Sequence, residues 1–566
     1  MVRVSVFLCV TIFAGNAFSQ NLYLNDYYYE PYFSGFIFPT SFACIGEEEF
    51  LVLEIHTGRV IHLKEGNKTI ALDLDVSNNA EQGLLGIALH PNFITNGVVA
   101  LFYSKNDQIG KDGGNWIDNR VETFSWDGEK LNFLNTLITF PYDPDQKNGP
   151  THDGGKLTVG KDGHLYITHG DFLRGGFENP RIEMNTSETD VAGVGGIYRI
   201  SFTGEIPRDN PFYNNSNPQI QSLYTYGLRN CFGIATDPYT GRIWATDNGP
   251  DQYDEVDIIG SGFNGGWLKI CGPDVRASKY AENNYTDYDA NDLVYLPNAY
   301  YDDPVFSWLQ PIGVTQLVFL DSYKFSPQER GNVLIGEFNY GGLYLFEVNT
   351  NRNGFVLGGA LADKVADNSE ERNLNKVGDN WGIIVDMTIG NDGYLYLLRF
   401  ETGEIYRIRP YQDPVIPKSF DLKAGKLVNG TLTDIQFSDD SYMIFQTMLG
   451  RAAGDAQIEV FSVAPPPSTK TLTELQFFVE SKSFKPLVQT IELYNYETQK
   501  YQLVSLSTTT SSDNTTQVSI TSDINRFIEP LTREIKARVS WYSVFSILSF
   551  QSAIELDNAS WKFIYK

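Results

Sequence analysis

The chain has 566 residues, a length that predicts two domains, because a single hydrophobic core rarely supports so many. Aromatic residues make up 14% of the chain and glycine contributes 50 residues, a balance that favours short strands and tight turns over helices. The formal net charge of −27 argues against binding to nucleic acid or anionic membranes, since both need clustered lysine and arginine.

The N-terminus has the features of a secretory signal peptide. Arg3 precedes a short apolar run, and the small-residue sequence Ala17-Phe18-Ser19 follows that run. The run is too short to span a bilayer. We therefore predict that residues 1–19 are removed and that the mature protein is secreted, held at the cell surface or exported to a periplasm-like space.

Export leaves three cysteines, Cys44, Cys231 and Cys271, in the mature chain. An oxidising compartment permits one pair, for which Cys231 with Cys271 is one choice, but three free thiols are an equal alternative. Seven sequons fit a glycosylated surface protein. They begin at Asn67, Asn185, Asn214, Asn284, Asn429, Asn514 and Asn558.

Two-stranded hairpins recur along the first 410 residues. Segments 157–168, 234–246 and 387–398 each contain two β-rich runs around an Asp-Gly or Thr-Gly turn, and weaker copies occur elsewhere. Glycine in such turns supplies the positive φ that tight hairpins require. Six such units predict a six-bladed β-propeller over residues 36–410, with a large β-sandwich as the structural alternative.

Beyond residue 410 the sequence becomes rich in serine, threonine and alternating apolar residues. Strict alternation predicts strands with one buried face, so we expect residues 413–566 to form a separate antiparallel β-sandwich. Exposed aromatic side chains there would stack on sugar rings and make the domain an accessory module for glycan binding or surface attachment. The alternative is that they form the domain's own core. These residues are Tyr494, Tyr496, Tyr501, Trp541 and Tyr542.

His152 is the first candidate for chemistry. It lies in a glycine-flanked turn before a predicted strand, where an imidazole suits proton abstraction from a hydroxyl near neutral pH. Asp171 follows the next strand, and a carboxylate bonded to imidazole fixes its tautomer and raises its basicity. The structural alternatives are a histidine packed in a turn and an aspartate that satisfies backbone amides.

Arg229 and Asn230 begin another predicted hairpin, and a Gly249-Pro250 corner with acidic neighbours ends it. An arginine, an amide and a corner with exposed carbonyls can hold an anionic oxygen and a hard cation together. A structural arginine between two blades, and an acidic loop that is merely solvated, are the alternatives.

Four segments in this order resemble the signature of the glucose/sorbosone dehydrogenase family, the soluble quinoprotein sugar dehydrogenases. The resemblance spans residues 36–410 and implies a six-bladed propeller that oxidises the C1 hydroxyl of a sugar with pyrroloquinoline quinone (PQQ), Ca²⁺ and an external electron acceptor. The segments are 81–93, 151–157, 204–212 and 226–256.

The resemblance also implies roles for individual residues. His152 is the base that takes the hydroxyl proton, Asp171 orients it, and Arg229 with Ca²⁺ polarises the acceptor carbonyl. The remaining implied positions contact the cofactor, the substrate or calcium. Glu81, Asn230 and Asn339 are the cofactor-side positions, Gly249 and Pro250 offer carbonyls to the catalytic calcium, and Asp254 and Glu255 could hold a second, structural calcium.

The sequence departs from the family where relatives that bind PQQ tightly present a lysine and an arginine pair to its three carboxylates. Asn339 stands near the lysine position, and Ile383 and Val385 stand near the arginine positions. A buried tricarboxylate needs cations. Arg372, Lys376 or Arg399 could substitute. Two alternatives therefore stay open: a non-catalytic cell-surface binding module, as in hedgehog-interacting-protein-like relatives, and a calcium-dependent propeller hydrolase.

Overall fold

The computed structural model describes residues 20–141, 151–172, 194–277, 288–438, 440–447, 455–543 and 552–566, together with Ile182 and Asn185. The predicted signal peptide lies outside these residues. The described chain is dominated by strands, which confirms the all-β prediction. Its helices are short: α1 (Phe93–Asn96), α2 (Pro218–Ser222), α3 (Asp274–Ala277) and α4 (Ser369–Arg372). Within the described ranges, none of the helices has the length and apolar character needed to cross a membrane.

The chain divides into two compact units, one built around residues 29–408 and the other around residues 409–566. Tyr23 and the described residues before it belong to the first unit, and residues 24–28 belong to the second. Each unit is described by itself below.

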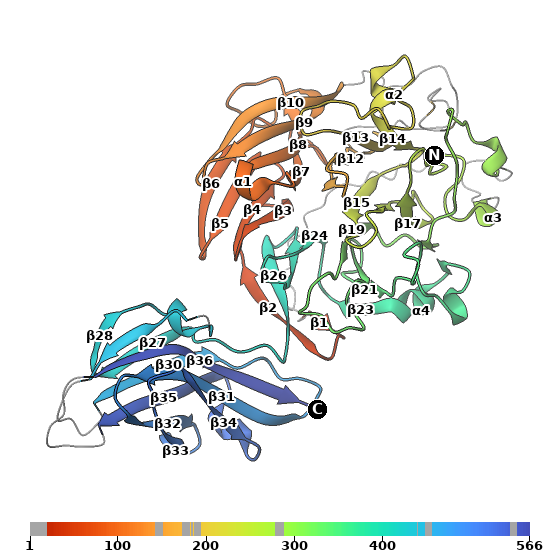
Figure 1. Cartoon of the computed structure of the whole chain (residues 1–566). Coiled ribbons are helices and arrows are strands. Elements are labelled where there is room, and N and C mark those ends of the chain that lie inside the picture. The colour runs from red at the N-terminus through yellow and green to blue at the C-terminus, as the bar shows by residue number, and fades with distance from the viewer. Residues whose placement is uncertain are drawn as a thin grey trace. The chain divides into compact units, whose positions relative to one another are not determined.

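Six small sheets make up the first unit in the described residues (Figure 1). One strand pair, β18 (Phe306–Trp308) with β22 (Val365–Ala366), is parallel. The first three sheets are β3 (Pro39–Gly46), β4 (Glu49–Glu54), β5 (Arg59–Lys64) and β6 (Asn67–Asp73); β7 (Leu84–Leu89), β8 (Val98–Asn106), β9 (Trp116–Trp126) and β10 (Leu131–Pro141); and β11 (Leu157–Val159), β12 (Leu165–His169), β13 (Gly196–Ile200) and β14 (Leu223–Tyr226).

The other three sheets each recruit a strand from elsewhere in the sequence. Strands β22, β1 and β2 each lie at one edge of their sheet. The sheets are β15 (Cys231–Thr236), β16 (Ile243–Asp247), β17 (Asp254–Ile259), β18 (Phe306–Trp308) and β22 (Val365–Ala366); β19 (Val314–Phe319), β20 (Val333–Glu337), β21 (Leu343–Phe346), β23 (Lys376–Asp379) and β1 (Asn21–Leu22); and β24 (Ile384–Ile389), β25 (Leu395–Arg399), β26 (Glu404–Pro410) and β2 (Tyr27–Phe33).

One strand of each sheet lines a common cavity of about 430 Å³. The six strands are β3, β7, β11, β15, β19 and β24. A ring of sheets around one cavity is a β-propeller, so the predicted propeller fold is confirmed and the alternative of a single large sandwich is wrong. The three predicted hairpins are also confirmed, since β11–β12, β15–β16 and β24–β25 each pair in register around their turns.

Two five-stranded sheets form the second unit, and residues from both contribute to one core that includes the buried Trp541, Trp561, Phe445 and Phe477. The sheets are β27 (Ser419–Ala424), β30 (Ala456–Val463), β35 (Glu534–Ser543), β32 (Leu487–Asn495) and β33 (Lys500–Thr508); and β28 (Lys426–Asn429), β29 (Met443–Gln446), β36 (Ala553–Tyr565), β31 (Leu472–Ser483) and β34 (Asn514–Ile520).

The aromatic residues of the second unit do not all face solvent. Trp541 is fully buried and its indole N–H donates to Gln489 Oε1 at 2.9 Å, so the prediction that it is exposed is wrong. Tyr494 and Tyr501 are half-buried, with ring centroids 5.1 Å apart. The guanidinium carbon of Arg538 lies 3.6 Å from the ring centroid of Tyr501. This ring therefore already has a cation on one face.

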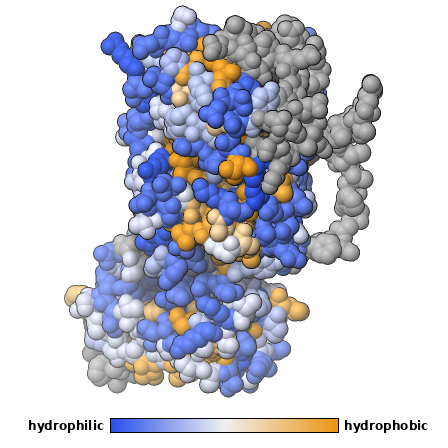
Figure 2. Space-filling view, turned by 90° about the vertical axis from the view of Figure 1, so that its right-hand side faces the viewer, coloured by the Kyte–Doolittle hydropathy of each residue, from blue (hydrophilic) through white to orange (hydrophobic). Residues whose placement is uncertain are grey.

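Of the two alternatives for the cysteines, the structure has the second: Cys44, Cys231 and Cys271 are all free thiols. The face of the molecule in Figure 2 is mostly hydrophilic, with hydrophobic residues in scattered patches. This distribution is consistent with the acidic composition acting as a solubility device.

Candidate functional site

The predicted site residues lie in the segments that lead into the inner strands. Glu81 precedes β7, His152 precedes β11, and Arg229 precedes β15. Hydrogen bonds join these segments: the His152 main-chain N–H donates to Glu81 Oε2 at 2.7 Å, and the Asp171 main-chain N–H donates to the Arg229 carbonyl at 2.9 Å. The structure therefore brings together residues that are far apart in sequence.

His152 and Asp171 form a buried pair. Their Nδ1 and Oδ1 atoms are 2.6 Å apart, and the two residues are 7% and 3% exposed. His152 has φ of 59°, a left-handed conformation that turns the chain sharply before the glycines at 154 and 155. When Nδ1 carries the proton that Asp171 accepts, Nε2 carries the lone pair. The pair is thus arranged to take a proton at Nε2.

Arg229 and Asn230 are anchored by the carboxylate of Asp247. Their main-chain N–H groups donate to its two oxygens at 2.8 and 2.6 Å. Burial raises the pKa of Asp247 to about 6, although the two N–H groups oppose this rise. The Arg229 guanidinium donates to the carbonyls of Asn248 and Gly249 at 2.8 and 3.1 Å. The Gly249 carbonyl, a predicted calcium ligand, therefore already contacts a cation.

Both carboxylate oxygens of Asp254 accept hydrogen bonds from main-chain N–H groups. Oδ1 accepts from the Gly249 N–H at 3.0 Å, and Oδ2 accepts from three consecutive main-chain N–H groups at the start of β19. Burial raises its pKa to about 6 against these hydrogen bonds. Asp254 thus ties the corner after β16 to the next blade, and it has little acceptor capacity left for a metal ion.

Glu255 faces a different environment. It accepts a hydrogen bond from the Gly272 N–H, and burial together with the neighbouring Asp257 and Asp247 raises its pKa well above the usual value. A cavity of about 10 Å³, the volume of one water molecule or ion, is lined by Glu255, Asp247 and Gly249. Pro250 is not among the described residues that line it. The described residues contain no group of three His, Cys, Asp or Glu side chains spaced for a metal.

Clustered buried carboxylates next to a main-chain carbonyl nevertheless form the oxygen-rich environment that a hard cation prefers. A divalent ion here would keep Glu255 and its neighbours ionised, since its charge offsets the burial that raises their pKa. On this test, the oxygen atoms around the Glu255 cavity are of the type that calcium takes, but both Asp247 oxygens and the Gly249 carbonyl already accept hydrogen bonds.

Asn339 lies in the turn between β20 and β21 and is exposed. Its main-chain N–H donates to the Ile312 carbonyl at 3.0 Å, and the Ile312 N–H in turn donates to Asp254. Asn339 therefore lies at the same end of the propeller, although no hydrogen bond joins it directly to His152 or Arg229 in the described residues.

The three cations that could replace the family's basic cluster already have partners. Lys376 Nζ lies 3.4 Å from Asp379 Oδ1, and Arg399 contacts Glu401 and Glu404 at 3.3 and 3.0 Å. The Arg372 guanidinium carbon lies 4.4 Å from the ring centroid of Tyr340, and its charge lowers the pKa of buried Glu337, which burial raises to about 7. A tricarboxylate would have to compete with these carboxylates for its cations.

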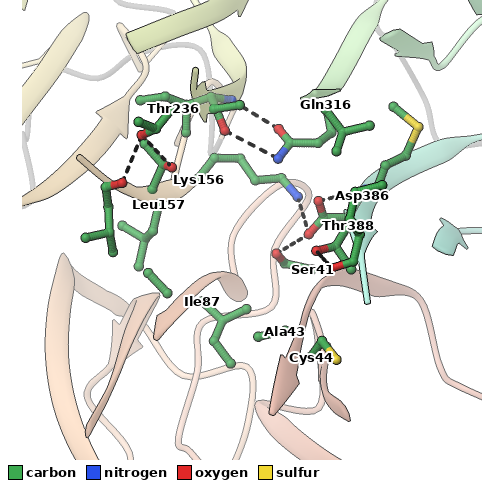
Figure 3. Close-up of a pocket in the computed structure, with 18 of the residues that line it drawn as sticks. Ser41, Ala43, Cys44, Ile87, Lys156, Leu157, Thr236, Gln316, Asp386 and Thr388 are labelled. Atoms are coloured by element: carbon green, nitrogen blue, oxygen red, sulfur yellow. Dashed lines mark hydrogen bonds and ion pairs between the residues drawn. The ribbon is translucent and has the colours of Figure 1, made fainter. Parts of the chain in front are cut away.

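Two features of the site were missed in the sequence. The indole N–H of Trp267 donates to Asp171 Oδ2 at 2.9 Å, and the guanidinium carbon of Arg229 lies 5.6 Å from the Trp267 ring. The second feature is a buried ion pair: Lys156 Nζ lies 3.2 Å from Asp386 Oδ2 (Figure 3). The Asn-Gly-Gly-Trp run at 264–267 was the available signal for the first.

Lys156 reaches across the central cavity. It follows the His152 turn, and its ammonium donates to the main-chain carbonyls of Thr40 and Val385 at 2.9 and 3.0 Å. Figure 3 shows the ammonium pointing toward Asp386, which also accepts from the Ser41 hydroxyl. Burial lowers the pKa of Lys156 and Asp386 opposes this. The pair links three blades at their inner strands.

Residues 36–407 match the family model described as glucose / sorbosone dehydrogenase. The chain is 28% identical over 378 residues to the aldose sugar dehydrogenase YliI of Escherichia coli, which covers 66% of this chain and 90% of that protein. It is 27% identical over 258 residues to quinoprotein glucose dehydrogenase B of Acinetobacter calcoaceticus, with 42% and 52% of the two chains covered. The soluble aldose sugar dehydrogenase of Escherichia coli, solved in its apo form, has a TM-score of 0.51 and 25% identity, and the match covers 68% of this chain and 99% of that one.

Proposed function

This chain belongs to the glucose/sorbosone dehydrogenase family, and on that basis we propose that it is an exported dehydrogenase that oxidises the C1 hydroxyl of a sugar to a lactone. It would use PQQ and Ca²⁺ and pass electrons to an external acceptor. The observation that carries the proposal is the buried His152–Asp171 pair, hydrogen-bonded through the Asp171 main chain to Arg229. A propeller that served only as a scaffold would not need a histidine–aspartate pair beside an arginine at this point.

In this proposal His152 takes the sugar hydroxyl proton at Nε2. Asp171 accepts the Nδ1 proton throughout and stabilises the imidazolium that forms, since the two atoms are 2.6 Å apart in a buried site. Glu81 accepts a hydrogen bond from the His152 main-chain N–H and so holds the backbone of the turn from which the ring projects.

Arg229 and Asn230 would bind the acceptor's carbonyl edge. Asn230 supports this role because its Oδ1 is buried and has no hydrogen-bond partner in the described residues. PQQ, when bound, supplies the hydride acceptor. Calcium would be held by Glu255 and the Gly249 carbonyl, with the Arg229 guanidinium releasing that carbonyl, whereas Asp254 would position the corner.

The residues present suit the carbonyl end of PQQ better than its carboxylate end. At the carbonyl end, the Arg229 cation and the unpartnered Asn230 amide oxygen fit. At the carboxylate end, Arg372, Lys376 and Arg399 already face carboxylate or aromatic partners. This last observation favours one alternative, a propeller that has lost the quinone and acts as a cell-surface binding module.

The second unit would serve as an accessory module, attached to the cell surface or binding glycans, without a part in the redox step. Support for glycan contact is limited to the half-buried tyrosine cluster of β32 and β33, whose Tyr494 and Tyr501 rings lie beside Lys536 and Arg538. A glycan array with the full chain and with Tyr494→Ala tests it, and equal binding by both would contradict this role for the cluster.

The dehydrogenase proposal is tested by reconstituting the full chain with PQQ and Ca²⁺ and measuring dye reduction across a panel of aldoses. A general base contributes about 10²–10⁴-fold to rate, so His152→Ala should lose at least about 100-fold. His90→Ala is the matched control, because His90 lies between β7 and β8, away from the site residues. Failure of PQQ to stabilise the chain, together with no dye reduction by any aldose, would leave the binding module or the calcium-dependent hydrolase.

A further inference from the structure

Trp267 contacts both Asp171, through its indole N–H, and Arg229, through its ring. We propose that Trp267 is a positioning residue that lowers the proton affinity of His152 by donating a hydrogen bond to Asp171, a role that rests on His152 acting as the base. The contact is specific to the indole N–H, which separates it from simple packing.

The two carboxylate oxygens of Asp171 contact different residues, His152 and Trp267. Oδ1 lies 2.6 Å from His152 Nδ1, and Oδ2 accepts from Trp267 Nε1 at 2.9 Å. The main-chain N–H of Asp171 is also engaged, with the Arg229 carbonyl. Asp171 is only 3% exposed, so water contributes little to these interactions. The indole is therefore a defined second donor to the carboxylate that His152 depends on.

Trp267 is itself held by buried amides. The Asn185 side-chain amide donates to the Trp267 carbonyl at 2.8 Å, and Asn185 and Asn264 exchange side-chain hydrogen bonds of 2.9 and 2.7 Å. Both asparagines are fully buried. The Trp267 main-chain N–H donates to the Gly227 carbonyl at 2.9 Å. These contacts hold the main chain of Trp267 in place, so the indole reaches Asp171 from a fixed backbone position.

The direction of the effect follows from charge. A carboxylate that shares its charge with an indole N–H is a weaker acceptor for imidazolium, and it therefore stabilises protonated His152 less. Removing the N–H should make Asp171 a stronger acceptor and His152 easier to protonate. Other ionisable groups near this pair would be retained in the variant. They are Glu81, Asp153, His169, Arg229 and Asp247.

The experiment is an NMR titration of histidine C–H signals in the full chain without quinone, with His152 assigned from His152→Gln. Trp267→Phe keeps an aromatic ring and removes the donor, and we expect the His152 midpoint to rise by about 0.5–1 pH unit. Trp381→Phe is the matched control, since the Trp381 indole donates to the Asn21 carbonyl at 2.9 Å. An unchanged midpoint in Trp267→Phe, or an equal shift in Trp381→Phe, would overturn the proposal.

A second measurement needs no tryptophan variant, in case Trp267→Phe does not fold. One of the eight indole N–H signals should shift with the same midpoint as His152, and that shift should vanish in His152→Gln. If no indole signal follows the midpoint, the coupling does not exist. The titration is independent of turnover. If the indole signal follows the His152 midpoint but the wild type reduces no dye, the proposed dehydrogenase is refuted and the coupling is not.

In an active enzyme, the acidic limb of the kcat/KM profile of Trp267→Phe should move in the same direction. We expect kcat to fall about 10-fold, because the hydrogen bond also orients Asp171. A fall in kcat with an unmoved acidic limb would show a purely structural role and would refute the proposal.

Discussion

In the metal-free chain, raising the pH from 5 to 7.5 is expected to lower the free energy of unfolding. Burial raises the pKa of Asp247 and of Asp254 from 3.8 to about 6. Between these values the folded state holds more protons than the unfolded state, so stability decreases as the pH rises. Integrated from pH 5 to 7.5, each of the two groups removes about 1.4 kcal/mol of stability.

Other buried groups act over the same range. Burial raises the pKa of Asp153 and of Glu337 to about 7, which adds about 2.5 kcal/mol of loss for each. His169 opposes them, because burial lowers its pKa to about 4 and its contribution to stability therefore increases by about 2 kcal/mol as the pH rises. The net expectation is a loss of several kcal/mol.

Chemical denaturation in the presence of a chelator, at pH 5 and at pH 7.5, measures this difference. Adding Ca²⁺ at pH 7.5 should recover part of the loss in the wild type, because the ion offsets the repulsion among Glu255, Asp247 and Asp257. Glu255→Gln should recover less. A metal-free chain that is more stable at pH 7.5 than at pH 5 would refute the assignment of these buried carboxylates.

Three further outcomes are expected. Asp171→Asn should reduce dye reduction by about 100-fold or more without a comparable loss of stability, and near-normal activity would contradict its place beside the base. Lys156→Met should cost about 3–5 kcal/mol in denaturation, because it leaves the buried carboxylate of Asp386 unpaired, whereas the exposed Lys161→Met should cost little; similar values for both would contradict this. Peptide mapping should find no glycan at Asn185, whose amide is buried and hydrogen-bonded, and a glycan there in folded protein would contradict the structure. Exposed sequons should carry any glycans: Asn67, Asn214, Asn429 and Asn514.

Features set by neighbouring residues could be predicted from the sequence, and features set by distant ones could not. Asp-Gly turns fix their hairpins locally, so the hairpins predicted at 157–168 and 387–398 are confirmed. The buried face of β35 was in principle readable, because Trp541 continues the alternation of Ile535, Ala537 and Val539. Tyr542, the next residue, then points to the opposite face of the strand, so Trp541 and Tyr542 could not both be exposed.

The candidate site shows the same division. The glycines beside His152 marked a sharp turn, and the turn is there. Asp254 accepts hydrogen bonds from the main-chain N–H groups of residues 312–314, about 60 positions away, and the acidic composition gives no clue to these contacts. The contact between Trp267 and Asp171 spans 96 positions and is equally invisible in local sequence.

The pairing of β2 with β26 gives the ring a clasp made from its two ends. An ion pair between Glu30 and Arg407, 377 positions apart, reinforces it. During synthesis β2 emerges long before β26, so until residue 410 has left the ribosome β2 has no strand to pair with, and its open edge invites pairing with other chains. Association through this edge is therefore expected to compete with folding until the final step, ring closure.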